Sequence, residues 1–297
     1  MSVNLPTHYV QQYSTNVNLL LQQKGSKLRN AVMVGMHVGK QASPVDQIGS
    51  IEMLAAPTRF APMPRVDAST DRRWVFPSDF HLPQLIDTFD KLRLITDPSS
   101  SYVQNAVFAA GRKFDSLICT AFTGTAKTGE TGSTSTSFTA ANEVDVATGG
   151  SNSKLNVAKI KAVKELMMAN HIDFDMEECY IGITAADHAS LLNEIQIISS
   201  DFNGNGMVLK EGKIDSFLGF KFIHCELIET ALAGTNEVTL PVWCKSGMHL
   251  GLWGDVQNAV SIREDITARP WQLYTTMTAG ATRLEEDRVY AIESYRA

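Results

Sequence analysis

The chain has 297 residues, a hydrophobic content of 44% and a formal net charge of -6, so it can bury a large core in one or two domains. The acidic balance argues against a main function in binding nucleic-acid phosphates, because that function needs a basic surface. The four cysteines form no CxxC pair, which favours buried reduced thiols over a disulfide framework or a zinc site. No segment reaches the ~18 apolar residues of a membrane span, and no signal-peptide pattern opens the chain.

The first part of the chain predicts an arm followed by a long excursion. Residues 4–24 have a polar helical pattern with a narrow apolar stripe, typical of an arm that packs on a partner. Extended runs then cover 31–40, 48–55 and 73–77, with prolines between them, and predict a hairpin-like excursion. A solvated loop would look similar, but ordering about 50 residues with little helix needs contacts from elsewhere. We therefore expect an inter-subunit contact at its charged residues, Arg59, Arg65, Asp67, Asp71, Arg72 and Arg73.

The longest helical pattern in the chain covers residues 98–123, and we call it the spine helix. Asp97 and Pro98 mark its start, and Gly124 marks its end. A helix of about 26 residues is a rod of roughly 39 Å, long enough for several elements to pack on it. Its apolar residues recur at three- and four-residue spacings and form one stripe: Val103, Ala106, Val107, Ala110, Phe114, Leu117, Ile118 and Ala121.

The remainder of the chain predicts a mixed helix and strand region. Residues 124–153 are rich in Gly, Ser and Thr and predict an exposed loop or loose hairpin. An amphipathic helix follows at 156–170, with Lys159, Lys161 and Lys164 on its solvated face. A buried strand is expected at 179–184, then a helix that opens with Thr184 and Asp187 as a capping box. Strands are expected at 219–228, 239–253, 258–265 and 288–295.

Two loops resemble ligand-binding motifs, but each lacks a residue that the motif requires at its end. The run from Gly124 to Gly129 resembles a phosphate-binding loop, but Glu130 follows where Lys and Ser or Thr are needed. The residues Asp201, Asn203, Asn205 and Gly206 imitate half of a calcium loop, whose twelfth position would need Glu and is Gly212. We therefore expect no metal site and no cofactor.

Four polar residues are weighed as catalytic or ligand residues. Asp187 and His188 are adjacent, so on a helix they point in different directions, and capping plus surface is the preferred interpretation. His224 and His249 fall in strands without a third ligand at a metal-site spacing, and we expect core or interface residues. No catalytic residue is predicted.

The order of these parts resembles the major capsid proteins of tailed bacteriophages, the Hong Kong 97 fold family. The phrases that carry the resemblance are YVQQYSTNVNLLLQQKGSKLR, LRLITDPSSSYVQNAVFAAGRKFDSLICTAFTG, KIDSFLGFKFIHCELI, SGMHLGLWGDV and TARPWQLYTTMTAGATRLEEDRVYAIES. The resemblance implies an α+β fold with an N-terminal arm at 1–30 and an extended β-hairpin loop, the E-loop, at 31–86. It further implies a peripheral domain at 87–125 and 261–297, which holds the spine helix, and an axial domain at 126–260.

The resemblance also implies a function without catalysis. The chain would be the major capsid protein of a virion, made in the bacterial cytoplasm, whose pentamers and hexamers form an icosahedral shell around double-stranded DNA without binding it specifically. Portal, scaffolding and decoration or cement proteins would be its other partners, and no membrane is involved. An encapsulin-like compartment shell is the alternative within the fold, and a hydrolase or nucleotide-binding enzyme is the alternative outside it.

Two departures from the family's founding member carry expectations. That member joins its subunits covalently through an E-loop lysine that attacks an asparagine, whereas here no lysine occurs between Lys40 and Lys91. We expect a non-covalent shell held by apolar burial and by Arg59, Arg65, Arg72 and Arg73 against carboxylates. A long helical N-terminal extension, which some members use as a scaffold, is not seen, so we expect a separate scaffolding protein and an unprocessed N-terminus.

Overall fold

The computed structural model describes residues 22–55, 65–86, 99–194, 197, 212, 214–234, 236–267 and 269–296. The chain divides into two compact units. The first contains Met1–Ser26, Asp79–Arg112 and Gly254–Thr278, and the second contains Lys27–Ser78, Lys113–Trp253 and Ala279–Ala297. Each unit is therefore assembled from segments that are far apart in the sequence, and the division does not follow chain order.

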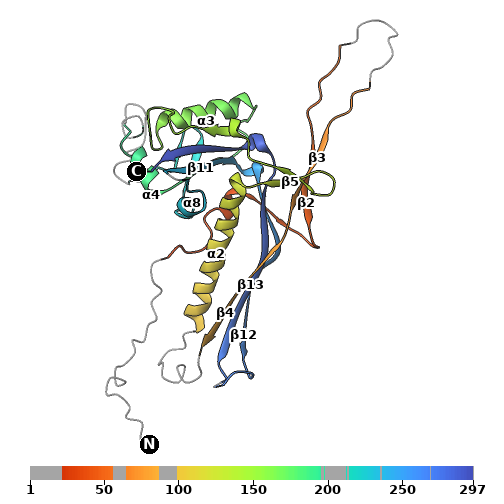
Figure 1. Cartoon of the computed structure of the whole chain (residues 1–297), viewed down its shortest axis with the longest axis vertical. Coiled ribbons are helices and arrows are strands. Elements are labelled where there is room, and N and C mark those ends of the chain that lie inside the picture. The colour runs from red at the N-terminus through yellow and green to blue at the C-terminus, as the bar shows by residue number, and fades with distance from the viewer. Residues whose placement is uncertain are drawn as a thin grey trace, which may run out of the picture. The chain divides into compact units, whose positions relative to one another are not determined.

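The first unit is built on long strands. A four-stranded sheet has the order β1-β12-β13-β4. Its long strands are β12 (Met248–Ile262), β13 (Trp271–Arg283) and β4 (Ser78–Ile86). The first unit contains β12 from residue 254 onward, β13 up to residue 278 and β4 from residue 79 onward. The hydroxyl of Thr278 donates to Asp79 Oδ1 at 2.7 Å, which joins β13 to β4. Figure 1 shows these strands running side by side.

The second unit has a six-stranded sheet of order β7-β14-β11-β8-β10-β9 as its core. Its strands are β7 (Glu143–Val144), β14 (Val289–Tyr295), β11 (Glu237–Cys244), β8 (Cys179–Ile183), β10 (Phe220–His224) and β9 (Ser216–Phe217). The sheet is mixed, because β8 pairs in parallel with β10 and antiparallel with β11. All five residues of β8 are buried, as expected for a central strand covered on both faces.

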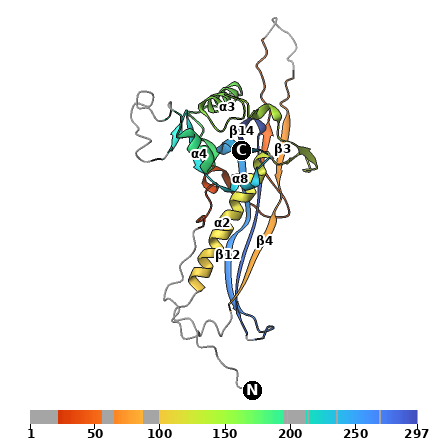
Figure 2. The same cartoon turned by 60° about the vertical axis from the view of Figure 1, so that its left-hand side comes forward.

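Short helices cover this sheet. Helix α3 (Val157–Ala169) begins after Asn156, whose side chain accepts the Lys159 N–H at 2.9 Å as an N-cap. Helices α4 (Ala185–Leu191) and α8 (Leu227–Ala231) follow β8 and β10. Both views agree that α3 lies on one face of the sheet and α8 on the other (Figures 1 and 2).

A third sheet, of order β2-β3-β5-β6, completes the second unit. Strands β2 (Ala42–Ile48) and β3 (Thr70–Val75) form the two sides of the predicted excursion. Strands β5 (Ala126–Thr128) and β6 (Thr134–Thr136) form the hairpin that was expected within 124–153. The remaining short elements are β1 (Met33–Met36) and 3-10 turns at Arg29–Ala31, Ala140–Asn142, Lys245–Gly247 and Glu286–Arg288.

The predicted spine helix is present as α2, Ser99–Thr123. It ends where expected, since the N–H of Gly124 bonds to the Thr120 carbonyl at 3.1 Å. The buried face differs from the predicted stripe. Val107 is 39% exposed, whereas Asp115, Cys119 and Phe122, which the predicted stripe does not include, are buried.

Several sequence predictions need correction. The strand expected at 48–55 lies earlier, at Ala42–Ile48, and 49–55 has no regular structure. The strand expected at 219–228 stops at His224, and helix α8 takes over. The residue pattern alone did not mark β4 or β13 as strands. The helical pattern at 4–24 falls outside the described residues up to position 21, as do Asp97 and Pro98.

Lys159 is the clearest error on a helix face, because it was expected in solvent and is fully buried. Its ammonium donates to the carbonyls of Ser153 at 2.7 Å and Glu293 at 2.6 Å. Burial lowers the pKa of Lys159 to about 8. The first turn of α3 therefore packs on both the preceding loop and β14, so its lysine has no solvated side there.

Candidate assembly surface

The two sides of the excursion hold each other by an exposed ion pair. Asp46 and Arg72 are direct partners in the antiparallel register of β2 and β3. The Arg72 Nε donates to Asp46 Oδ1 at 2.6 Å and its Nη2 to Oδ2 at 3.0 Å, which is the bidentate geometry that a guanidinium favours. The Arg72 guanidinium also lies over the Trp74 ring, 5.7 Å from its centre. These contacts set the register of the hairpin.

Beyond the paired strands the excursion exposes apolar side chains. In Figure 1 the segments after β2 and before β3 extend away from β5 and the six-stranded sheet. Arg65 pairs with Asp67 at 2.8 Å, and both side chains are more than 60% exposed. Uncovered apolar groups in a soluble subunit indicate a surface that a partner buries. The large exposed ones here are Ile48, Ile51, Met53, Leu54 and Val66.

The base of the hairpin is fixed by a half-buried carboxylate that binds two arginines. Glu286 Oε1 accepts from Arg73 Nη1 at 3.1 Å, and Oε2 accepts from Arg283 Nε at 2.7 Å. The Arg73 side chain is only 7% exposed. Its charge is used within the chain, so the prediction that Arg73 fastens neighbouring subunits is not supported by its position.

Arg283 extends this cluster to the end of the spine helix. Its Nη1 donates to the carbonyls of Phe122 at 2.7 Å and Gly124 at 2.8 Å. Carbonyls at a helix C-terminus lack intrahelical partners and carry partial negative charge, so a cation is stabilised there. The base of the excursion, the end of β13 and the end of α2 are thus joined through one buried network.

The hairpin of β5 and β6 supports the excursion from its other edge. Strand β3 pairs with β5, and the Trp74 indole N–H donates to the Gly129 carbonyl at 2.7 Å. Asp71 Oδ1 accepts the Gly129 N–H at 3.2 Å. The glycine has φ of +84°, a conformation that other residues adopt at a cost. The Gly124 to Gly129 run therefore forms a turn beside the excursion. Arg59, also predicted at the contact surface, lies outside the described residues.

The residues weighed as an acid–base pair are separated by their surroundings. Asp187 is fully buried and accepts from Thr184 Oγ1 at 2.7 Å, Ser294 Oγ at 2.5 Å and Arg296 Nη2 at 2.5 Å. Burial alone would raise its pKa, but these hydrogen bonds outweigh burial and hold the pKa of Asp187 below its ordinary value. The predicted cap is not formed, because Thr184 donates to Asp187 instead of accepting a backbone N–H. Asp187 thus ties α4 to the chain end.

The two weighed histidines have different environments. His249 is buried on β12, and its Nε2 lies 2.8 Å from Nε2 of His37. Burial and, to a smaller extent, the neighbouring His37 lower the pKa of His249 to about 4. His224 is exposed and pairs with Glu226 at 2.6 Å. Among the described residues, no group of three or more potential metal ligands occurs.

The cysteines are free and buried, as predicted. Pairing of β8 with β11 brings Cys179 and Cys244 opposite each other, with their Sγ atoms 3.0 Å apart. The sequence separation of 65 residues concealed this contact. The hydrogen bond with the Cys179 thiol and, next, burial raise the pKa of Cys244, so it stays protonated and unreactive.

Sequence reasoning missed Asp115, which joins the spine helix to residues 27 and 28. Its Oδ2 accepts the Lys27 N–H at 2.9 Å, and its Oδ1 accepts the Leu28 N–H at 3.0 Å. The sequence signal for this contact was a single carboxylate, Asp115, next to the apolar stripe residue Phe114. In the described part of the chain, no helix is long and apolar enough to cross a bilayer.

Comparison with known proteins gives a consistent result. A family model described as phage capsid protein matches residues 5–295. The chain is similar to a capsid structure of cyanophage P-SCSP1u, with 15% identity, 97% of this chain and 93% of that chain covered, and a TM-score of 0.74. It is also similar to the capsid of cyanophage Pam1, with 10% identity, 100% and 99% covered, and a TM-score of 0.72. No curated protein sequence matches.

Proposed function

Because the chain belongs to the phage capsid protein family, we propose that it is the major shell subunit of a tailed bacteriophage, and that many copies enclose the double-stranded DNA genome. The observation that carries this function is the family match over residues 5–295. The fold agrees, since the capsid structures above superpose over nearly the whole chain. The fold is of the Hong Kong 97 type, and the virion capsid is where this subunit acts.

The parts of the fold receive roles within this proposal. Residues 1–30 are the N-terminal arm, 31–86 the E-loop, 87–125 and 261–297 the peripheral domain, and 126–260 the axial domain that meets its copies around five- and six-fold axes. The exposed apolar side chains of the E-loop support this assignment, because a neighbouring copy would bury them.

The E-loop charges that contact neighbours are Arg59, Arg65, Asp67, Asp71 and Arg72. The exposed positions of Arg65 and Asp67 support this set. Arg73 is left out because its side chain is only 7% exposed, whereas those of Arg65 and Arg72 are 85% and 41% exposed. Exposed ion pairs contribute little to the stability of one subunit, typically below ~1 kcal/mol, so these charges are available for specificity between subunits.

The shell acts as a container without catalysis. The net charge of -6 supports enclosure of DNA without specific binding, since phosphates are not attracted to an acidic wall. Assembly takes place in the host cytoplasm. A shell that closes at a fixed size and admits a genome at one vertex needs a scaffolding protein and a portal protein, and a decoration protein is a further partner. The encapsulin-like alternative is not favoured, because the matching family is that of phage capsids.

Particle contents test this function directly. Particles containing the chain are purified by gradient sedimentation, treated with nuclease and extracted. We expect nuclease-protected double-stranded DNA in mature particles. Particles that hold a protein cargo and no DNA would favour the compartment alternative, and a chain that sediments only as a small oligomer in every preparation would contradict the shell function.

A further inference from the structure

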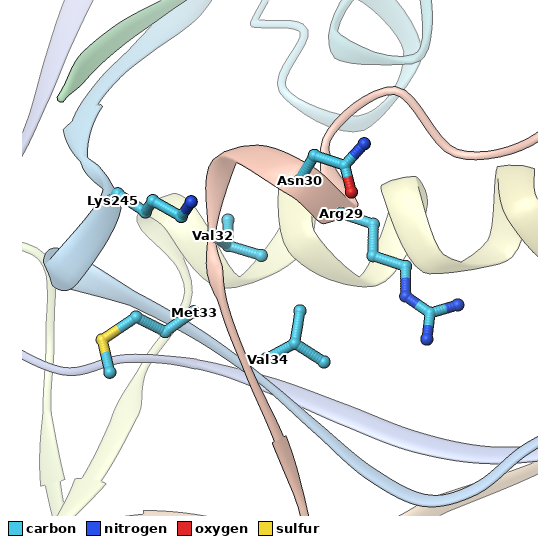
Figure 3. Close-up of a pocket in the computed structure, with 6 residues that line it drawn as sticks. All are labelled: Arg29, Asn30, Val32, Met33, Val34 and Lys245. Atoms are coloured by element: carbon cyan, nitrogen blue, oxygen red, sulfur yellow. The ribbon is translucent and has the colours of Figure 1, made fainter.

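An open pocket of roughly 350 Å³ lies beside β1 in the second unit. It is lined by Arg29, Asn30, Val32, Met33, Val34 and Lys245, and in Figure 3 the two valines lie between Lys245 and the Arg29 guanidinium. Both charged residues of the pocket are cations. An open apolar floor between two cations suits a ligand segment that carries a carboxylate next to an apolar side chain.

The strand beside the pocket has a free edge. β1 is the last strand in its sheet order and pairs in parallel with β12, Val34 opposite Leu250. Its outer edge pairs with no other strand in the described ranges. Met33, Val34 and Met36 are all at least 39% exposed. A short apolar edge strand of this kind can accept an additional extended segment.

Lys245 is available for a partner. It makes no ion pair within the part of the chain that the structure describes, and its backbone N–H bonds to the Glu178 carbonyl at 3.0 Å. The Glu178 carboxylate is occupied by Lys221 at 2.5 Å and by the Tyr180 hydroxyl at 2.7 Å. Arg29 is held over the Phe114 ring, 5.3 Å from its centre, which positions its guanidinium at the pocket wall.

A matching segment exists on the same chain. Glu52 is exposed between Ile51 and Met53, and it makes no ion pair with any described residue. Leu54 is 61% exposed. In an extended segment, residues two apart share a face and lie about 7 Å apart. Glu52 and Leu54 therefore present a carboxylate and an apolar side chain on one face of the segment.

We propose that residues 51–54 of one copy dock along β1 of a second copy, with Glu52 paired to Lys245 and Arg29 and Leu54 packed on the exposed side chain of Val34. The proposal rests on the shell function and names the receiving site for the excursion. Charge complementarity selects this occupant, because a carboxylate on an apolar exposed segment meets a cationic pocket with an apolar floor. Pairing with the free edge of β1 adds backbone hydrogen bonds that do not depend on side chains.

A charge swap tests the pairing. The variants Glu52→Lys and Lys245→Glu, and the double variant that carries both, are assembled under conditions in which the wild-type chain forms shells. We expect each single variant to reduce the shell fraction, measured by gradient sedimentation, about tenfold, and the double variant to restore it to within about twofold. Lys154→Glu, which reverses an exposed lysine elsewhere in the unit, should assemble like wild type.

Cysteine cross-linking keeps the test valid if a charge variant folds poorly. The native thiols are buried, so a chain with Glu52→Cys and Lys245→Cys should give disulfide-linked multiples of the subunit on oxidation of shells. A chain with Glu52→Cys and Lys154→Cys should not. The docking site would be overturned if the double charge variant gave the same low shell fraction as the single variants, or if both cysteine pairs cross-linked equally. Either result would leave the shell function intact. A wild-type chain that never forms shells would instead contradict the shell function.

Discussion

Arg73 and Glu286 are 213 residues apart in the chain, yet the Nη1 of the first lies 3.1 Å from Oε1 of the second. Their side chains are 7% and 16% exposed. The same carboxylate binds the fully buried Arg283. The base of the excursion thus depends on one glutamate that neutralises two desolvated cations.

Replacing this glutamate should be strongly destabilising. Glu286→Gln leaves two arginines without their counter-charge, and breaking a buried pair by removing one partner costs about 3–5 kcal/mol. Urea unfolding of the unassembled protein measures the effect. The control is Glu178→Gln, whose ion pair with Lys221 is about half exposed and should contribute below ~1 kcal/mol. Equal losses in the two variants would show that the cluster at Glu286 does not hold the base.

The spine helix carries the second prediction. Phe114 is 1% exposed on α2, so Phe114→Asp places a charge in the core and should prevent folding and assembly. Lys113→Ala, at the exposed neighbouring position, should change stability by about 0.5 kcal/mol or less. Circular dichroism and sedimentation of both variants make the comparison. Normal shells from Phe114→Asp would mean that the buried face of α2 is wrongly placed.

The spine helix also shows how far the sequence can be interpreted. Its length and its end at Gly124 could be predicted, because capping and apolar periodicity are local properties. The burial of Asp115 could not, since its partners are the N–H groups of Lys27 and Leu28, 87 or more residues away. Lys159 fails for the same reason, because its acceptor Glu293 lies on a distant strand.

The candidate surface was predictable in character and not in detail. The excursion and its mixed charges follow from prolines and extended runs, as the sequence indicated. The sequence does not indicate that Arg72 is exposed and Arg73 buried. Alternate residues of a strand face opposite sides, and only the pairing of β3 decides which side is buried. The contact of His37 with His249 likewise needed the parallel pairing of β1 with β12.

The histidine pair predicts a pH dependence of stability. The pKa of His249 is about 4 in the folded chain, against about 6.5 for an unperturbed histidine. Between these values the unfolded chain binds more protons, so stability is lost as the pH falls from about 6.5 to about 4. The loss attributable to this residue should be about 3 kcal/mol, because the two pKa values differ by about 2.5 and each pKa unit corresponds to about 1.36 kcal/mol.

The measurement is urea unfolding of the unassembled protein at pH 7 and pH 4.5. His249→Gln should show a smaller loss between the two values than the wild-type chain. His188→Gln, which changes a half-exposed histidine on α4, should retain the wild-type difference. If His249→Gln lost as much stability between pH 7 and pH 4.5 as the wild-type chain, burial of His249 would not be the cause of the pH dependence.

The composition of the excursion predicts a shell without covalent cross-links. No lysine occurs between positions 40 and 91, so the tip of the loop lacks an amine that could form an amide bond with a neighbour. Purified shells boiled in detergent should give one band at the subunit mass of 32.6 kDa. A ladder of higher multiples that survives reducing agent would contradict a non-covalent shell.

Electron microscopy of the purified, assembled protein tests the central claim most directly. The account predicts closed icosahedral shells whose capsomers are pentamers and hexamers of this chain, with the six-stranded sheet unit recognisable in each subunit. Small oligomers without closed shells, seen in the presence of the scaffolding and portal proteins encoded with it, would contradict the assignment as a shell subunit.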